Sequence, residues 1–158
     1  MFMKNQIQTI EITDEIYKTI LKAIESAIKY ENLTGRKLGI TGEIGEILVC
    51  HKLGLKLLQN PISAGYDAID IKGKEEVRYQ IKSRKVNNRS LGGVTGSFSN
   101  HGFDFAVLVI LDEDYKILKI YQADYKGLNP ILERRGRRNP TIKQFIAVSD
   151  CIYKIKNA

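Results

Sequence analysis

"GYDAIDIKGKEEVRYQIKSRK" (Gly65–Lys85) contains two runs of alternating apolar and polar residues on either side of the turn signal KGKE. Alternation with a period of two is typical of β-strands, and a short gap that contains glycine joins two antiparallel strands in a hairpin. Gln80 and Lys82 share one face of the second strand, because successive side chains point to opposite faces. The hairpin therefore carries polar side chains on a face that a sheet ordinarily buries.

The position of the turn decides which aspartate lies beside this polar pair. A turn at residues 73–74 places Asp67 opposite residues 80–81, whereas a turn near residue 75 places Asp70 there instead. Burying a carboxylate, an amide and an ammonium group together costs free energy unless they bind something. A divalent cation with a phosphate ligand would satisfy all three groups, and Mg²⁺ prefers oxygen ligands.

Two helices are predicted before the hairpin. Isoleucines recur at four-residue spacing from Ile16 to Ile28, which indicates an amphipathic helix over residues 13–35. A second helix is predicted over residues 41–54, between a threonine-glycine start and a closing glycine. Glu43 and Glu46 are three residues apart in it, so they lie near one face of the helix.

The rest of the chain completes an α/β pattern. In chain order we expect a strand at 55–59, a polar loop with room for one short helix at 86–102, a central strand buried on both faces at 105–111, a strand at 116–123, a basic loop at 133–140 and a last helix at 141–156. These elements predict a sandwich in which helices flank a central mixed sheet. We expect a single domain over residues 1–158, with a helical part at 1–40, a core at about 41–125 and a basic part at 126–158.

Positive charge is concentrated in two places. The formal net charge is +7, yet residues 126–158 hold eight Lys and Arg against two acidic residues, and residues 72–89 hold seven against two. A local excess of this kind favours a polyanion partner such as nucleic acid, although a solvated basic face is the alternative. The candidate phosphate contacts are Arg84, Lys85, Arg89, Arg134, Arg135, Arg137 and Arg138.

Several other classes of protein find no support in the sequence. Its N-terminus lacks a signal-peptide pattern and no run of 18 apolar residues occurs, so we expect a cytoplasmic protein without a membrane partner. Cys50 and Cys151 are far apart and outside any metal-binding pattern, which predicts two buried free thiols. The two histidines lack nearby metal-binding partners, and no phosphate-binding GxxxxGK[ST] loop is present.

The segments GYDAID (65–70) and YQIKSR (79–84) together resemble the PD-(D/E)xK nuclease superfamily, which has the restriction-endonuclease-like fold. The preceding GEIGE (42–46) is similar to the first core helix of that superfamily, which often supplies a further glutamate. The resemblance covers about residues 41–84. This chain has QxK where most members have ExK or DxK, a variant similar to the Mrr-type branch of restriction enzymes.

The resemblance implies a metal-dependent nuclease that hydrolyses phosphodiester bonds in DNA, with a role in restriction, another defence system or repair. It implies Mg²⁺ as the cofactor, with Mn²⁺ able to substitute, and a homodimer would suit a small nuclease that cuts both strands. The implied site residues are Asp67 or Asp70 as the metal-binding aspartate, Gln80 in place of the second acidic metal ligand, Lys82 as the catalytic lysine and Glu46 as a further metal ligand. Asp67 is preferred because apolar residues follow it, and Glu46 because Gly45 beside it lets the helix approach the sheet.

Two alternatives to a working nuclease stay open at this point. Glutamine at position 80 removes one negative charge from the metal site, so the chain is alternatively a nucleic-acid-binding module that keeps the fold without catalysis. Its small size also suits a subunit or interaction domain of a larger assembly. The interpretation without any function is a solvent-facing hairpin on which Asp67, Gln80 and Lys82 form an ordinary cross-strand polar cluster.

Overall fold

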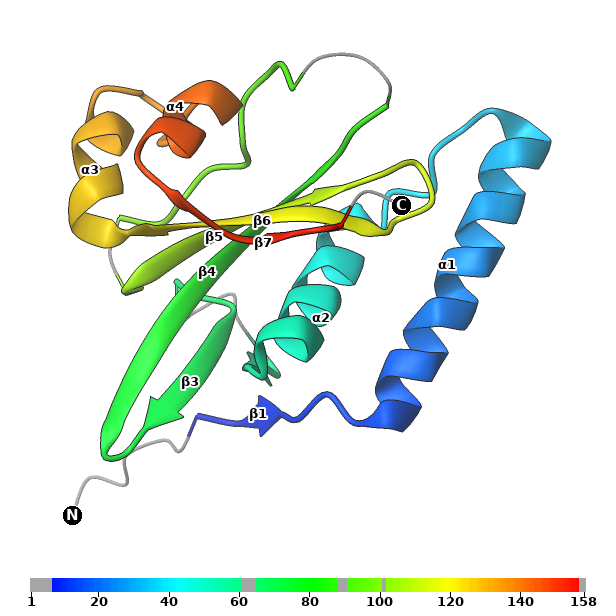
Figure 1. Ribbon diagram of the computed structural model, residues 1–158, viewed down its shortest axis with the longest axis horizontal. Helices are drawn as coiled ribbons and strands as arrows, with labels where there is room; N and C mark the ends of the chain where they lie inside the picture. Colours follow the sequence, from blue (N-terminus) through cyan, green and yellow to red (C-terminus); the bar gives the residue numbers. More distant parts are fainter. Residues whose placement is uncertain (1–6, 61–64, 88–90, 101, 157–158) are drawn as a thin grey trace.

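The structure, a computed structural model, describes residues 7–60, 65–87, 91–100 and 102–156 (Figure 1). One mixed sheet joins the strands of these residues in the order β1-β2-β3-β4-β5-β6-β7, and every neighbouring pair is antiparallel except β4 and β5. The strands are β1 (Thr9–Ile10), β2 (Lys56–Leu58), β3 (Ala68–Lys72), β4 (Glu75–Lys85), β5 (Phe105–Leu111), β6 (Ile117–Asp124) and β7 (Asp150–Lys154).

Helices cover both faces of this sheet. Helices α1 (Asp14–Thr34) and α2 (Thr41–Leu53) lie on one face, and α3 (Tyr125–Glu133) and α4 (Ile142–Ala147) lie on the other (Figure 1). The predicted α/β architecture, a mixed sheet flanked by helices, is confirmed. Within the described ranges, no helix is long and apolar enough to cross a membrane.

The central strand β5 explains why the sheet has two cores. Its residues 106–111 are all buried, with Val107 and Val109 packed beneath α1 and α2, and Leu108 and Ile110 packed beneath α3 and α4. A continuous apolar run is needed where both faces of a strand are covered. The prediction of a buried strand at 105–111 is therefore confirmed.

The two predicted N-terminal helices also have the expected ends. Thr13 accepts a hydrogen bond from the backbone N–H of Ile16 at the start of α1, and Gly35 ends that helix with a left-handed φ of 69°. Helix α2 begins at Thr41 and ends at Gly54, again with φ 69°. The threonine cap of α1 and the two closing glycines can be read in the sequence, whereas the start of α2 has Ile40 as its N-cap and no side-chain cap hydrogen bond.

The position of the hairpin turn places Asp67, and not Asp70, opposite the middle of β4. Lys72 pairs with Glu75, so Gly73 and Lys74 form a two-residue loop, with φ of 66° at the glycine. The same register pairs Ala68 with Tyr79. Continuing it by one residue sets Asp67 opposite Gln80.

The C-terminal part differs most from the prediction. The expected last helix at 141–156 is wrong, because α4 ends at Ala147 and the chain continues as strand β7, paired with β6. Residues 150–154 (DCIYK) include β-branched and aromatic side chains, which suit a strand. Cys151 lies on this strand and is exposed, so only Cys50 is the buried thiol that was predicted.

Two further elements were absent from the prediction. Helix α3 contains Gly127 and Pro130, which indicate a break, yet Leu128 and Leu132 are fully buried and hold it against the sheet. Strand β1 has only two residues. Conversely, the described residues of the segment at 86–102 contain no helix, and Val94 makes an isolated bridge to Thr141.

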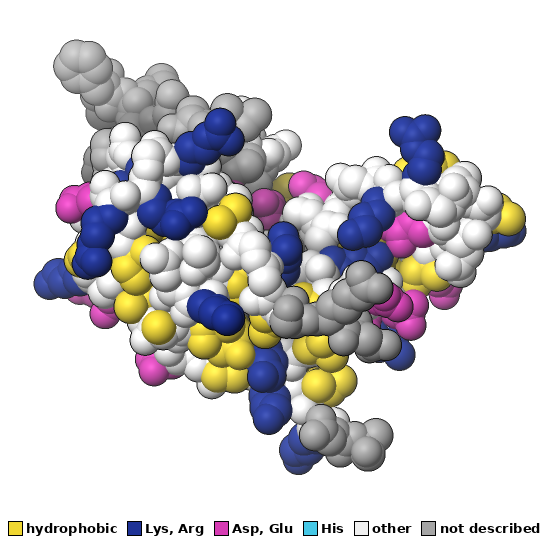
Figure 2. Space-filling model, turned by 90° about the horizontal axis from the view of Figure 1, so that it is seen from above, with side chains coloured by type: hydrophobic (Ala, Val, Ile, Leu, Met, Phe, Trp, Pro, Cys, Tyr) yellow, Lys and Arg dark blue, Asp and Glu magenta, His cyan; other side chains and the backbone are white. Residues whose placement is uncertain are grey.

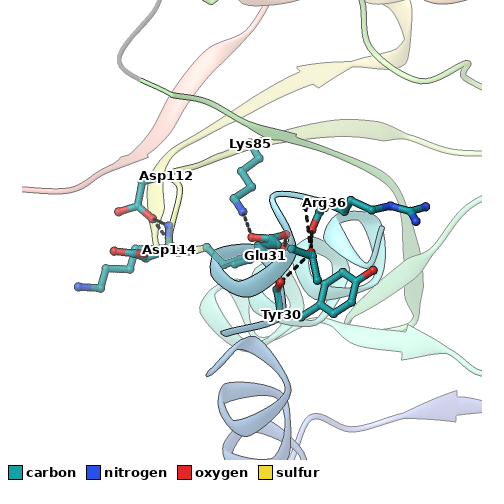
Figure 3. Close-up of polar contacts among 9 residues, drawn as sticks. Tyr30, Glu31, Arg36, Lys85, Asp112 and Asp114 are labelled. Atoms are coloured by element: carbon teal, nitrogen blue, oxygen red, sulfur yellow. Dashed lines mark hydrogen bonds and ion pairs between the residues drawn. The ribbon is translucent and has the colours of Figure 1, made fainter. Parts of the chain in front are cut away.

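A cluster of polar side chains ties α1 to the sheet. Figure 3 shows the Lys85 ammonium group directed toward the Glu31 carboxylate. The two groups are 3.0 Å apart, and the Tyr115 hydroxyl donates a 2.7 Å hydrogen bond to the other oxygen of Glu31. The Lys85 nitrogen also lies 3.7 Å from the centre of the Tyr115 ring. The Tyr115 hydrogen bond, followed by the smaller effects of Lys85, holds the pKa of Glu31 below its ordinary value.

We predict that Tyr115→Phe lowers the free energy of unfolding by about 1–2 kcal/mol at neutral pH, since a hydrogen bond to a charged group is lost. The Glu31 carboxyl has a lowered pKa in the folded protein, so its contribution is present above pH 4.5 and is lost as the pH falls below that value. Urea unfolding at several pH values measures this. The difference between wild type and variant should shrink in acid, and a constant difference would contradict the assignment.

Tyr125→Phe is the matched control, because the Tyr125 hydroxyl donates to the backbone carbonyl of Asn100, which does not titrate. Its effect on the free energy of unfolding should therefore stay the same across the acidic range.

Candidate active site

Asp67 lies where β3 separates from β4. Its backbone N–H donates to the carbonyl of Tyr79 at 2.8 Å, and its Oδ2 accepts from the backbone N–H of Ile81 at 2.7 Å. The aspartate thus spans the two residues of β4 that flank Gln80. Burial raises the pKa of Asp67, the Ile81 hydrogen bond and the Lys82 charge oppose this rise, and Glu43 adds to it.

Gln80 and Lys82 share one face of β4, as predicted. The structure shows that this face lies opposite α2, since Ile81 and Ser83 face that helix. Gln80 is buried, and its Oε1 accepts from the backbone N–H of Ser99 at 3.0 Å. The Lys82 ammonium group lies 5.5 Å from the centre of the Phe98 ring. Both side chains therefore face the segment that connects β4 to β5.

An open cavity of about 410 Å³ lies beside these groups. Asp67 and Gln80 line it together with the aromatic rings of Tyr66 and Phe98 and with Gly65, Ser97 and Ser99. A cavity with a few polar groups among aromatic walls is a common form of ligand site. Here it gives a ligand access to the aspartate and the amide.

Glu46 comes to the same site from α2. Burial raises the pKa of Glu46 to about 8, the charges of Asp67 and Glu43 add to this rise, and the Lys82 charge opposes it. These electrostatic effects mean that the three carboxylates and the ammonium group are close enough to influence one another. Within the described residues, neither Glu46 nor Asp67 forms an ion pair.

Gly45 makes the approach of Glu46 possible. A Cβ atom added at Gly45 would lie 1.8 Å from the Oγ of Ser83 and 2.7 Å from its Cβ, so only glycine fits between α2 and β4 here. Residue 46 is thereby held next to the sheet. The expectation that this glycine permits a close approach of the helix is confirmed.

The donors at the site fit Mg²⁺ better than a metal that needs a full set of protein ligands. Among the described residues, no three His, Cys, Asp or Glu side chains are grouped so as to hold a metal ion by themselves. Mg²⁺ keeps several waters and is usually bound through one or two carboxylates plus substrate phosphate. Two partly buried carboxylates that repel each other, Glu46 and Asp67, match that preference.

Asp70 does not join this group. It is paired with Val77 along the hairpin, and its carboxylate lies 3.9 Å from the Lys72 ammonium group on the exposed part of the strand. The structure thus brings together Asp67, Gln80, Lys82 and Glu46 of the residues expected from the sequence, and leaves Asp70 outside.

The predicted phosphate contacts occupy different environments. Arg134 and Arg137 are exposed, Arg135 is partly buried, and Arg89 lies outside the described residues. Arg84 donates to the carbonyl of Gly92 at 2.9 Å. Lys85 is paired with Glu31, and Arg138 donates hydrogen bonds to the backbone of residues 98–99.

A groove of about 700 Å³ continues from β4 toward the end of α1. Its lining includes Arg36, Lys37 and Arg84, together with the ion pair of Lys85 and Glu31. Figure 2 looks onto the molecule from above, and Lys and Arg side chains lie on both sides of the hollow between the α1 part and the remainder. Arg84 and Lys85, the cations that follow Lys82 on β4, therefore border a groove.

Ser99 belongs to the site and had no signal in the sequence. Its hydroxyl lies 2.7 Å from the carbonyl oxygen of Gly65 and 3.2 Å from the Oε1 of Gln80. Contacts of this kind depend on where the long connection between two parallel strands crosses the sheet. The spacing and periodicity of residues in the sequence do not predict the path of this connection.

Comparison with known proteins places the chain beside one family. The model of the Bsp6I restriction endonuclease family matches residues 5–145, which include every element from β1 to α3. This family belongs to the restriction-endonuclease-like superfamily, so the expected superfamily is confirmed. No curated protein matches the chain.

We predict that Gly45→Ala lowers the free energy of unfolding by about 1–3 kcal/mol, the usual cost of overpacking, because the new methyl group collides with Ser83. Adding Ser83→Gly removes both colliding atoms and should recover part of the loss. Gly42→Ala in the same helix is the control, since nothing lies within 4 Å of its Cβ position. Equal stability of Gly45→Ala and Gly42→Ala in urea unfolding would show that α2 does not depend on this close approach.

A second prediction concerns pH. The folded protein keeps the Glu46 proton up to about pH 8, whereas the unfolded chain loses it near pH 4.5. In metal-free buffer with EDTA, the stability of the wild type should therefore fall, relative to Glu46→Gln, as the pH rises from 4.5 to 8. Unfolding curves at several pH values measure the difference. Parallel pH profiles for the two proteins would be inconsistent with a buried, repelled carboxyl at this position.

Proposed function

Since the chain belongs to the Bsp6I restriction endonuclease family, we propose that it is a metal-dependent endonuclease that hydrolyses phosphodiester bonds in DNA. The observation that carries this proposal is that two partly buried carboxylates and a lysine influence one another at one site. Asp67 directly precedes β3, Glu46 comes from α2 and Lys82 from β4, and each affects the pKa of Glu46 or Asp67. A restriction role follows most directly from the family.

The proposed cofactor is Mg²⁺, with Mn²⁺ able to substitute. Asp67 and Glu46 would hold it through carboxylate oxygens, with Gln80 beside them and the open cavity leaving room for substrate and water. A bound Mg²⁺ polarises the phosphate and lowers the pKa of water in the site. Burial raises the pKa of Glu46, and the repulsion from Asp67 adds to this rise; the repulsion favours a cation between the two carboxylates.

Lys82 would act on the reacting phosphate. Hydrolysis forms a bond between phosphorus and the oxygen of water and breaks the bond to the leaving oxygen of the nucleotide. Negative charge increases on the phosphate oxygens during this step, and an ammonium group fixed beside Phe98 is suited to stabilise it. Its attraction to Asp67 and Glu46 keeps the same group directed toward the carboxylates.

The proposed DNA contacts are the exposed arginines and the groove beside β4. Arg36, Lys37 and Arg84 border the groove, while Arg134 and Arg137 lie exposed after α3. Cations in these places would attract the phosphate backbone without reading sequence. Cleavage of both strands requires two sites, and a homodimer is the proposed arrangement.

The second candidate function is a DNA-binding module without catalysis. It is favoured by one observation, the use of the Gln80 oxygen by Ser99, because an amide so engaged contributes little to a metal site. Such a module would bind DNA with strong salt dependence and without a metal requirement.

Cleavage assays distinguish the two functions. Purified wild type with Mg²⁺ or Mn²⁺ should cut duplex DNA, and EDTA should abolish cutting. We expect Lys82→Ala and Asp67→Asn each to lower the cleavage rate by about 100-fold or more, since each removes a charge at the reacting phosphate. Asp67→Asn retains an oxygen that can accept from Ile81, so the fold should persist.

Matched controls come from the same hairpin. Asp70→Asn and Lys74→Ala change an aspartate and a lysine outside the site, and both should cut DNA at the rate of the wild type. Wild-type protein that binds duplex DNA but never cuts it with either ion, whatever the sequence offered, would instead support the binding module.

A further inference from the structure

The segment between β4 and β5 is fastened to the C-terminal part of the chain by backbone hydrogen bonds. Thr95 N–H donates to the carbonyl of Pro140 at 2.9 Å, and Ile142 N–H donates to the carbonyl of Gly93 at 3.0 Å. Phe98 N–H donates to the carbonyl of Arg138, also at 3.0 Å. Residues 93–99 therefore have a fixed path across the sheet, although they contain no regular helix.

Arg138 adds a side-chain contact to this backbone pairing. Its Nη2 donates to the carbonyl of Ser99 at 2.9 Å, and its Nε lies 3.2 Å from the same oxygen and 3.3 Å from the carbonyl of Phe98. The Nη2 also lies 3.4 Å from the side-chain oxygen of Asn129 on α3. The guanidinium group thus uses its Nε and Nη2 donors inside the protein, and Arg138 is only partly exposed.

Ser99, which accepts from Arg138, also forms hydrogen bonds to the candidate site. Its backbone N–H donates to the Oε1 of Gln80 at 3.0 Å. Its hydroxyl lies 2.7 Å from the carbonyl of Gly65, two residues before Asp67, and 3.2 Å from the Oε1 of Gln80. One serine therefore connects both strands that carry the site, because it contacts Gln80 on β4 and the approach to β3.

We propose that Arg138 and Ser99 are positioning residues, and that Gln80 is the anchor that receives them. In this assignment Arg138 holds the carbonyl of Ser99, Ser99 holds Gln80, and the wall formed by residues 96–99 is thereby fixed beside Lys82. Arg138 is then not a phosphate contact, and Gln80 serves the site through Ser99 more than as a metal ligand. The link to catalysis rests on the proposed function. The series of hydrogen bonds from Arg138 through Ser99 to Gln80 does not depend on that function.

The position of Lys82 explains what this arrangement achieves. The aliphatic part of Lys82 lies against Gly96, where an added Cβ would meet Lys82 Cδ at 3.5 Å, and its ammonium group faces the Phe98 ring. Both neighbours belong to the fastened segment. Releasing the segment would remove the wall that limits the directions available to the lysine.

The first test uses the free protein, without DNA or metal. Amide hydrogen exchange measured by NMR reports whether the Ser99 N–H is bonded to Gln80. We expect Gln80→Met, which lacks an acceptor, to lower the protection of this amide about tenfold, as for the loss of one hydrogen bond. Gln80→Glu keeps an oxygen there and should preserve the protection.

Arg138→Lys and Arg138→Met separate positioning from phosphate binding. Lysine keeps the charge but cannot bridge the carbonyls of residues 98–99 and Asn129, so both variants should lower the Ser99 protection about tenfold. The control is Arg137→Met, at an exposed neighbour, which should leave the protection unchanged. Ser99→Ala retains the N–H donor to Gln80 and loses the hydroxyl contacts, so it provides a milder variant should Arg138→Met not fold.

Binding of a duplex oligonucleotide at several salt concentrations provides the second readout. A residue that contacts a phosphate changes the slope of log K against log salt by about 0.9 when its charge is removed. We expect Arg138→Met to leave this slope unchanged. With Mg²⁺, Arg138→Lys should cut DNA at least about tenfold more slowly than wild type, since the loss of one fixing hydrogen bond is of that size.

The proposal is overturned if Arg138→Lys keeps both the Ser99 protection and the cleavage rate, or if Arg138→Met reduces the salt slope as a phosphate contact would. It is also overturned if Gln80→Met leaves the Ser99 amide as protected as in wild type. A wild type that does not cut DNA would remove the proposed function alone, because the exchange measurements require neither DNA nor metal.

Discussion

The 2.7 Å hydrogen bond from the Ile81 N–H to the Asp67 carboxylate is the contact on which the candidate site depends. It lies where β3 leaves β4, and it fixes a charged group at a place that is otherwise part of the core. The free-energy cost of that burial is visible in the raised pKa of Asp67 and of Glu46. Two carboxylates that repel each other add nothing to the stability of the protein, and this supports the proposal that a cation binds between them.

Three separate parts of the chain have to meet for this site to form. The hairpin supplies Asp67, Gln80 and Lys82, helix α2 supplies Glu46, and the connection between β4 and β5 covers the polar face of β4. Each part is held by an ordinary structural device: a two-residue turn, a glycine at the helix-sheet contact, and backbone pairing with residues 138–142. These contacts hold the candidate site on regular elements and paired backbone, which suits the proposed chemistry because charges must stay in fixed positions.

The sequence alone predicted the parts that local rules control. Alternation in the hairpin placed Gln80 and Lys82 on one face, and the glycine turn at residue 73 decided in favour of Asp67 once the register was known. Contacts between segments that are distant in the sequence could not be predicted from these local rules. Helix α3 forms despite Pro130 because Leu128 and Leu132 are buried, strand β7 forms because β6 offers an edge, and Ser99 reaches Gln80 only through the path of a long connection.

The central claim is that a divalent cation binds between Asp67 and Glu46, and a crystal structure of the protein soaked in Mn²⁺ tests it most directly. The account predicts an anomalous scattering peak in contact with both carboxylates, with Gln80 still hydrogen-bonded to the Ser99 N–H and Asp70 uninvolved. An anomalous peak at Asp70 would contradict the account. So would the absence of a peak between Asp67 and Glu46 in crystals soaked at a saturating concentration of Mn²⁺.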